Sequence, residues 1–238
     1  MYTPGNAYHY LSVGLSGIRC ISTALRSTRV EWPIETILDF PCGHGRVLRF
    51  LRPMFPGADI TAAEIEHSAL DFCRRAFSTS ILQSKKNLGE LVLSQRFDLI
   101  WCGSLLTHID EVSAKELLRF FHDHMTERGL CIFTTHGHRF IERIKNKKRT
   151  YGLSEDAQRK VADEFQRKGY GYANYPNQSD YGISAVAPER MRELAKAVGE
   201  WDETLLLECG WDDHQDVYAF TRQAPNRLPG EIEVTPQH

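Results

Sequence analysis

Apolar runs and amphipathic stretches alternate along the chain from Thr36 onward. Short apolar runs predict buried strands, and segments with apolar positions three or four residues apart predict helices. The strands are expected at 36–40, 58–63, 79–83, 97–102 and 129–135 and, later in the chain, at 203–209 and 217–221. Strands that alternate with helices indicate βαβ units, so we expect an α/β fold with a doubly wound, mostly parallel sheet.

Three amphipathic segments lie between these strands. The first begins at about His44 and continues until Pro53 and Pro56 stop it, because proline lacks the N–H that a helix interior needs. The second has a predicted buried face formed by Ala69, Cys73, Ala76 and Phe77. The third starts with the capping-box spacing Ser113-Ala114-Lys115-Glu116 and continues with an apolar stripe at Leu117, Phe121 and Met125.

Two further regions frame this core. A helical pattern at 7–26 is interrupted by Gly14 and Gly17, and we expect it to lie before the sheet and cover the site. A charged segment follows the fifth strand, and a helix begins near Pro188. The expected organisation is a single domain over 1–222, with an N-terminal helical cap at 1–30, a helical lid insertion at 139–180 and a disordered tail at 223–238.

The insertion is basic. Residues 139–170 hold ten Lys or Arg against five Asp or Glu. Its basic cluster consists of Arg143, Lys145, Lys147, Lys148 and Arg149. Such a cluster is most often a solvated helix end, and the alternative is a lid that recognises an anionic substrate.

Composition excludes several classes of protein. The chain has 238 residues and is 42% hydrophobic, so one sizeable core is expected. Its net charge is −2, so we expect no positive field that would attract nucleic acid or a membrane surface. No signal peptide or run of 18 apolar residues is visible, which predicts a cytoplasmic protein. The six scattered cysteines are expected to be reduced: Cys20, Cys42, Cys73, Cys102, Cys131 and Cys209.

The most informative stretch is 37–48, where an apolar strand ends on Asp39 and a turn with Gly43 and Gly45 follows. Glycines let the backbone approach a ligand closely, and the next helix N-terminus offers N–H groups. A dinucleotide turn would need a third glycine where Leu48 stands. A carboxylate beside the turn would repel a pyrophosphate and attract a cation.

The pattern Leu38-Asp39-x-x-Cys42-Gly43-x-Gly45 resembles the first motif of class I S-adenosylmethionine-dependent methyltransferases, although Pro41 stands where that family usually has glycine. The block 97–108 resembles the family's fourth motif. The resemblance implies a seven-stranded sheet and S-adenosyl-L-methionine as cofactor. In that reading Asp39 supports the cofactor's ammonium group.

Glu64 ends the second strand, where a nucleotide site needs a carboxylate to accept both ribose hydroxyls. The resemblance implies that Ile65 packs on the adenine, that Ser84 contacts its amine and that the backbone at Gly103-Ser104 lines the cofactor near its sulfonium. For Ser84, a simple turn serine is an equal alternative. The predicted cofactor-binding residues are Asp39, Cys42, Gly43, Gly45, Glu64, Ile65, Ser84, Gly103 and Ser104.

Methyl transfer to oxygen also needs a base. His108, one turn after Gly103-Ser104, is the first candidate because histidine titrates near neutrality. His136 and then His138 follow the fifth strand and are the next candidates. Further residues that could line the reaction chamber are Tyr10, Tyr181 and His214. No metal site is expected, because the paired histidines lack other ligands at a suitable spacing.

We therefore predict a methyltransferase acting on a small-molecule acceptor at oxygen. A nicotinamide-dependent oxidoreductase is disfavoured by Asp39 and Leu48, and a non-catalytic cofactor-binding or regulatory protein is the other alternative. Nucleic-acid methylation is weakened by the net charge and by Gly103-Ser104-Leu105-Leu106 in place of an Asn/Asp-Pro-Pro-aromatic motif. The sequence assigns neither the acceptor nor the oligomeric state.

Overall fold

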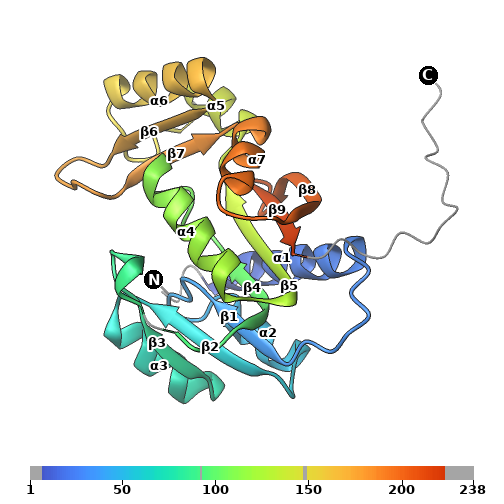
Figure 1. Ribbon diagram of the computed structural model, residues 1–238. Helices are drawn as coiled ribbons and strands as arrows, with labels where there is room; N and C mark the ends of the chain where they lie inside the picture. Colours follow the sequence, from blue (N-terminus) through green and yellow to red (C-terminus); the bar gives the residue numbers. More distant parts are fainter. Residues whose placement is uncertain (1–6, 92, 147–148, 223–238) are drawn as a thin grey trace, which may run out of the picture.

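A seven-stranded sheet forms the centre of the protein, as the computed structural model shows for residues 7–91, 93–146 and 149–222 (Figure 1). Its strand order is β3-β2-β1-β4-β5-β9-β8. The strands are β1 Thr36–Asp39, β2 Asp59–Glu64, β3 Ser80–Gln83, β4 Phe97–Cys102, β5 Met125–Thr135, β8 Asp202–Trp211 and β9 Gln215–Thr221. The first five run parallel, while β9 pairs antiparallel with both β5 and β8. The predicted doubly wound, mostly parallel sheet is confirmed.

Helices cover both faces of this sheet. They are α1 Ala7–Ser27, α2 Leu48–Met54, α3 His67–Phe77, α4 Glu111–His124, α5 His138–Lys145, α6 Glu155–Lys168 and α7 Pro188–Lys196, with a short 3₁₀ helix, η2, at Leu88–Glu90. One buried cluster joins the sheet to α4 and α7, and a second joins the other face to α1, α2 and α3. Figure 1 shows α4 in front of the strands and α1 behind them.

The strand register brings the carboxyl ends of three central strands together. Ile37 and Leu38 of β1 are fully buried, as expected for a central strand covered on both faces. Asp39, the last residue of β1, pairs with Ala62 of β2 and Trp101 of β4. The carboxyl ends of β1, β2 and β4 therefore meet, and parallel sheets of this kind bind ligands there.

The insertion after β5 is only partly helical. Helices α5 and α6 are followed by an antiparallel pair, β6 Tyr170–Asn174 and β7 Gly182–Val186, which forms a second sheet. A third buried cluster holds these elements together, and it includes Phe140, Val161 and Ile183. The insertion predicted as helical over 139–180 is helical in α5 and α6, but it ends in strand β6, which pairs with β7 just beyond it.

Strand β7 also joins the insertion to the main sheet. The N–H of Gly182 donates to the carbonyl of His108 at 2.9 Å, and the N–H of Ser184 donates to the carbonyl of Thr107 at 2.9 Å. The loop after β4 therefore behaves as an additional partner of the small sheet. The insertion is fixed to the residues that follow the fourth strand.

Two predicted helix features are wrong for physical reasons. Helix α1 continues through Gly14 and Gly17, because these glycines allow close packing rather than a break. A Cβ at Gly14 would lie 2.4 Å from the carbonyl oxygen of Arg46. The N-cap of α4 is Asp110, whose side chain accepts the N–H of Ser113 at 2.8 Å, so the helix begins before the capping box that the sequence suggested.

Smaller differences concern single positions. Helix α2 begins at Leu48, since the glycine turn occupies the residues before it. Leu70 takes the buried place on α3 that was predicted for Ala76, which is exposed. Met125 begins β5 instead of ending a helix. The predicted tail at 223–238 and two members of the basic cluster, Lys147 and Lys148, lie outside the described residues.

All six cysteines carry free thiols, and only Cys209 of them is half-buried rather than buried, as the sequence predicted for reduced residues. Within the described residues, no helix combines the length and the apolar character that a membrane crossing requires.

Candidate active site

The turn after β1 is built on two glycines in the left-handed region. Gly43 has φ 50° and Gly45 has φ 75°. A Cβ at Gly45 would lie 2.3 Å from the ring of Phe77, so this position needs glycine both for its φ and for the close approach of α3. Pro41, the departure from the family motif, precedes the glycines and lines the cavity above the turn.

Asp39 is a buried carboxylate that lacks one partner. It is 1% exposed, and its Oδ2 accepts no hydrogen bond from any described residue. Burial raises the pKa of this carboxyl well above its usual range, and nearby Cys73 and Glu64 raise it further. A buried, unsatisfied oxygen is costly unless a ligand completes it. The site therefore suits a cationic ligand, which would both pair with the carboxylate and lower its pKa.

Glu64 connects the end of β2 to the glycine turn. Its Oε2 accepts the N–H of Gly43 at 3.0 Å, and its Oε1 accepts the N–H of Ile65 at 2.7 Å. These two bonds hold the carboxylate in place and leave further lone pairs, because a carboxylate has about four acceptor positions. Both oxygens of Glu64 therefore keep acceptor positions for further donors in the cavity that it lines.

Residues from these strand ends enclose a cavity of about 320 Å³, which we call the strand-end cavity. The predicted cofactor residues that line it are Asp39, Cys42, Gly43, Glu64, Gly103 and Ser104. The other three predicted residues lie nearby. Gly45 is part of the turn, and Ile65 follows β2 and is 54% exposed. Ser84 follows β3, is buried, and donates its N–H to the carbonyl of Glu64.

Sequence reasoning missed an aromatic wall of this cavity. Trp211, at the end of β8, packs edge-on against Trp101 with ring centroids 5.4 Å apart. Its indole N–H donates to the carbonyl of Val13 in α1 at 2.9 Å. No local pattern in the sequence shows that Trp211 lies beside β4.

His108 lines the strand-end cavity with a defined tautomer. Its Nδ1 lies 2.8 Å from the carbonyl oxygen of Gly182, which can only accept, so Nδ1 carries the proton and Nε2 holds the lone pair. Burial lowers the pKa of His108, which keeps the ring neutral at pH 7. The ring stacks on Tyr181 with centroids 4.8 Å apart. A fixed neutral imidazole is the form that a general base requires.

The structure does not bring the other two histidine candidates to this cavity. His136 is buried, its Nδ1 donates to the carbonyl of Ser184 at 3.0 Å, and its ring stacks on Phe140. Burial, with a contribution from His214, lowers the pKa of His136 to about 3. His138 begins α5, is exposed and meets Phe165 edge-on.

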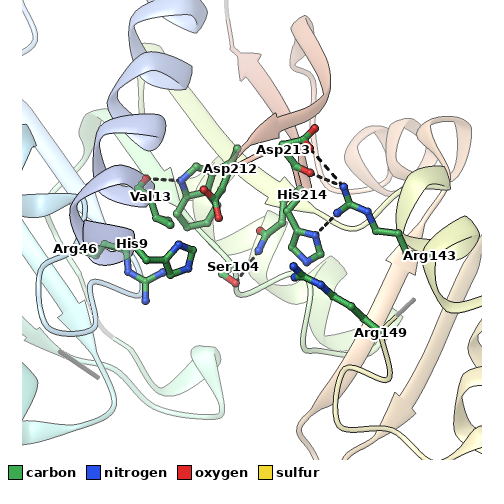
Figure 2. Close-up of a pocket in the computed structure, with 11 residues that line it drawn as sticks. His9, Val13, Arg46, Ser104, Arg143, Arg149, Asp212, Asp213 and His214 are labelled. Carbon is green, nitrogen blue, oxygen red and sulfur yellow. Dashed lines mark hydrogen bonds and ion pairs between the residues drawn. The ribbon is translucent and has the colours of Figure 1, made fainter. Parts of the chain in front are cut away.

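A second cavity of about 520 Å³ adjoins the first, and we call it the arginine cavity (Figure 2). Both cavities are lined by Arg46, Ser104 and Trp211. Ser104 has φ 65°, which lies in the left-handed region of backbone conformation. Two hydrogen bonds stabilise this conformation. The N–H of Ser104 donates to Thr134 Oγ1 at 2.8 Å, and its Oγ accepts from Gln215 Nε2 at 3.0 Å. Tyr10 and Tyr181 line the first cavity and His214 the second.

Residues 38–131 match a protein family described as a methyltransferase domain. The matched stretch runs from β1 into β5 and includes the glycine turn, Asp39 and Glu64. Together with the strand order, this match indicates a class I methyltransferase fold. Proteins of this class use S-adenosylmethionine, which has a cationic ammonium group and a ribose diol. The methyltransferase resemblance of the sequence is confirmed.

Individual relatives are distant from this chain. A malonyl-(acyl-carrier protein) O-methyltransferase of Anoxybacillus flavithermus is 24% identical over 117 residues, which are 49% of this chain and 44% of that protein. The chain thus spans less than half the length of that relative.

Solved structures share the fold over most of the chain. A S-adenosylmethionine-dependent methyltransferase from Clostridium acetobutylicum has a TM-score of 0.59 at 14% identity and covers 87% of this chain and 90% of its own. DesVI from Streptomyces venezuelae has a TM-score of 0.59 at 12% identity, covering 94% and 100%. The N-methyltransferase NodS from Bradyrhizobium japonicum, in complex with S-adenosylhomocysteine, has a TM-score of 0.54 at 12% identity, covering 85% of each.

Proposed function

We propose that this protein transfers a methyl group from S-adenosylmethionine to an oxygen atom of a small-molecule acceptor. The observation that carries the proposal is the unsatisfied buried oxygen of Asp39 in a cavity that also holds His108 with a basic Nε2. The matching of residues 38–131 to a methyltransferase domain supports the reaction type. The relatives named above include both O- and N-methyltransferases, so the basic histidine is what favours oxygen.

The residues of the strand-end cavity fit the cofactor group by group. Asp39 would pair with the ammonium, and Glu64 would accept the ribose hydroxyls while it remains bonded to the turn. The glycine turn would bring backbone atoms close to the amino-acid end. When bound, the cofactor supplies a methyl carbon that its sulfonium already makes electrophilic.

His108 and the shared wall of the two cavities would perform the remaining work. The Nε2 of His108 would take the proton of an acceptor hydroxyl, and the carbonyl of Gly182 would stabilise the imidazolium through Nδ1–H. Ser104 and Trp211 lie between the cavities and would align the acceptor and exclude water. Alignment of this kind contributes up to roughly 7–11 kcal/mol in well-oriented reactions.

Calorimetric titration of the full chain with S-adenosylmethionine, S-adenosylhomocysteine and NAD⁺ tests the cofactor assignment. We expect both adenosyl ligands to bind, and Asp39→Ala to weaken them by about 1.5–3 kcal/mol, the range for a hydrogen bond to a charged group. Asp59→Ala, at the exposed start of β2, is the matched control and should bind normally. Binding of NAD⁺ alone would favour the oxidoreductase instead, and unchanged affinity in Asp39→Ala would remove Asp39 from the site.

A further inference from the structure

The arginine cavity carries guanidinium groups on two facing walls (Figure 2). Arg46, directly after the glycine turn, lies with His9 of α1 on one side. Arg143 of α5 and Arg149, which follows that helix, lie on the other side. These side chains come from three separate parts of the chain, so their convergence is a property of the fold and not of one charge run.

His214 adds a hydrogen-bond donor to the same cavity. Its Nδ1 lies 2.6 Å from Nη1 of Arg143, and a guanidinium can only donate, so the imidazole proton is on Nε2. Burial and the nearby Arg143 lower the pKa of His214, which keeps the ring neutral. The ring stacks on Tyr151 with centroids 5.5 Å apart. Arg143 thus orients His214 with an N–H to offer.

The acidic groups of the cavity leave a positive excess. The main-chain carbonyl of Asp213 accepts a hydrogen bond from Nη2 of Arg143 at 2.7 Å. The Asp213 carboxylate oxygen Oδ2 lies 3.8 Å from the same Nη2, and the Asp213 side chain is 94% exposed. An ion pair so open to water is weak. Asp212 is also exposed. Two exposed carboxylates face the guanidinium groups of Arg46, Arg143 and Arg149, and those groups present several N–H donors in a planar fork.

We propose that the arginine cavity binds the anionic group, a carboxylate or a phosphate, of the methyl acceptor. Guanidinium groups bind both anions through paired charge-assisted hydrogen bonds. Because Ser104 and Trp211 line both cavities, an acceptor anchored between the arginines extends toward the strand-end cavity, where the methyl group is delivered. The inference rests on the proposed function and adds the substrate class.

The test uses the full chain saturated with S-adenosylhomocysteine and titrated with sodium acetate or with inorganic phosphate at constant ionic strength. The imidazole resonances of His214, assigned by comparison with His214→Gln, report binding by nuclear magnetic resonance. We expect a saturable shift with at least one anion and none with neutral acetamide. The anion that binds more tightly distinguishes a carboxylate acceptor from a phosphate acceptor.

Variants locate the binding. Arg149→Gln should weaken the anion by roughly threefold to tenfold, the range for a partly solvated charged contact, while affinity for S-adenosylhomocysteine stays unchanged. Arg159→Gln is the matched control, because Arg159 belongs to the same insertion, lies on α6 and pairs with Asp156 and Glu155.

Three results would overturn the inference: no saturable shift with either anion, an unchanged shift in Arg149→Gln, or anion binding that disappears once S-adenosylhomocysteine is present. The third result would mean that the arginines serve the cofactor's own carboxylate. If S-adenosylhomocysteine itself failed to bind, the proposed function would be contradicted instead. The anion titration of the free protein would then still report on the arginine cavity.

Discussion

The two adjoining cavities differ in where their walls come from and in the charge they present. The strand-end cavity is shaped by β1, β2 and β4, whose register fixes Asp39 beside Ala62 and Trp101. It presents carboxylates. The arginine cavity shares Arg46, Ser104 and Trp211 with it and is completed by α1, the insertion and the β8–β9 hairpin, whose Arg143 and Arg149 add guanidinium groups.

This difference separates two tasks. A site whose charges lie on packed strands keeps its geometry when peripheral segments change, whereas a site on helices and loops can vary in its ligand. The opposite charges also give the two cavities different ligand preferences, a cation for one and an anion for the other.

The largest expected effect concerns His108, which lines the strand-end cavity. His108→Gln should lower kcat by about 10²–10⁴-fold, the usual size of a general-base contribution, because glutamine cannot accept the proton at neutral pH. Affinity for S-adenosylhomocysteine, measured by calorimetry, should stay nearly constant. A parallel loss of cofactor binding and melting temperature would show that His108 is structural, and full activity would remove it from the mechanism.

Glu64→Gln tests the role of the Glu64 carboxylate in cofactor binding at the strand-end cavity. The amide keeps the shape but loses the charge and one acceptor, so both S-adenosylmethionine and S-adenosylhomocysteine should bind more weakly by roughly 1.5–3 kcal/mol. The two losses should be equal, because both ligands carry the ribose and uniform binding does not discriminate between them. Loss for only one ligand would place Glu64 near the sulfonium. Acetate or phosphate binding in the arginine cavity should not change.

A smaller effect concerns how the free energy of unfolding depends on pH at His136, whose ring meets that of His214 edge-on. The pKa of His136 is lowered to about 3 from an ordinary 6.5, so between these values the unfolded chain binds the extra proton and folding is weakened as pH falls. The wild-type protein should lose roughly 2 kcal/mol of unfolding free energy between pH 6.5 and pH 5 relative to His136→Asn. Denaturant unfolding at several pH values measures this difference. A constant difference across that range would contradict the burial of a neutral histidine.

The meeting of Asp39 and Glu64 at one end of the sheet could be predicted from the sequence, because each residue has a clear local pattern. Asp39 and Glu64 each end an apolar strand, and parallel strands bring their carboxyl ends together without further information. The wall formed by Trp211 and the oriented His214 could not be predicted in the same way. Their neighbours, Val13 and Arg143, lie 198 and 71 residues away in sequence. Only the tertiary fold determines these contacts.

The same reasoning explains the errors in the predicted elements. Gly14 looked like a helix interruption because its partner, the carbonyl of Arg46, is remote in sequence. The strands β6 and β7 were not predicted because glycine, alanine and serine interrupt the apolar runs that indicate buried strands. The assignment of the insertion as a lid that moves remains a prediction. Hydrogen exchange in α5 and α6, with and without cofactor, would measure that motion.

The hydrogen bond between His108 and Gly182 has a consequence for engineering this protein. The proton that defines the basic nitrogen of His108 is held by the first residue of β7, a strand that belongs to the insertion. Replacing the insertion to change the acceptor would therefore also change the chemistry, unless the graft keeps a carbonyl in that place. A graft must therefore keep the backbone of β7 from Gly182 onward, so that its bonds to His108 and Thr107 survive.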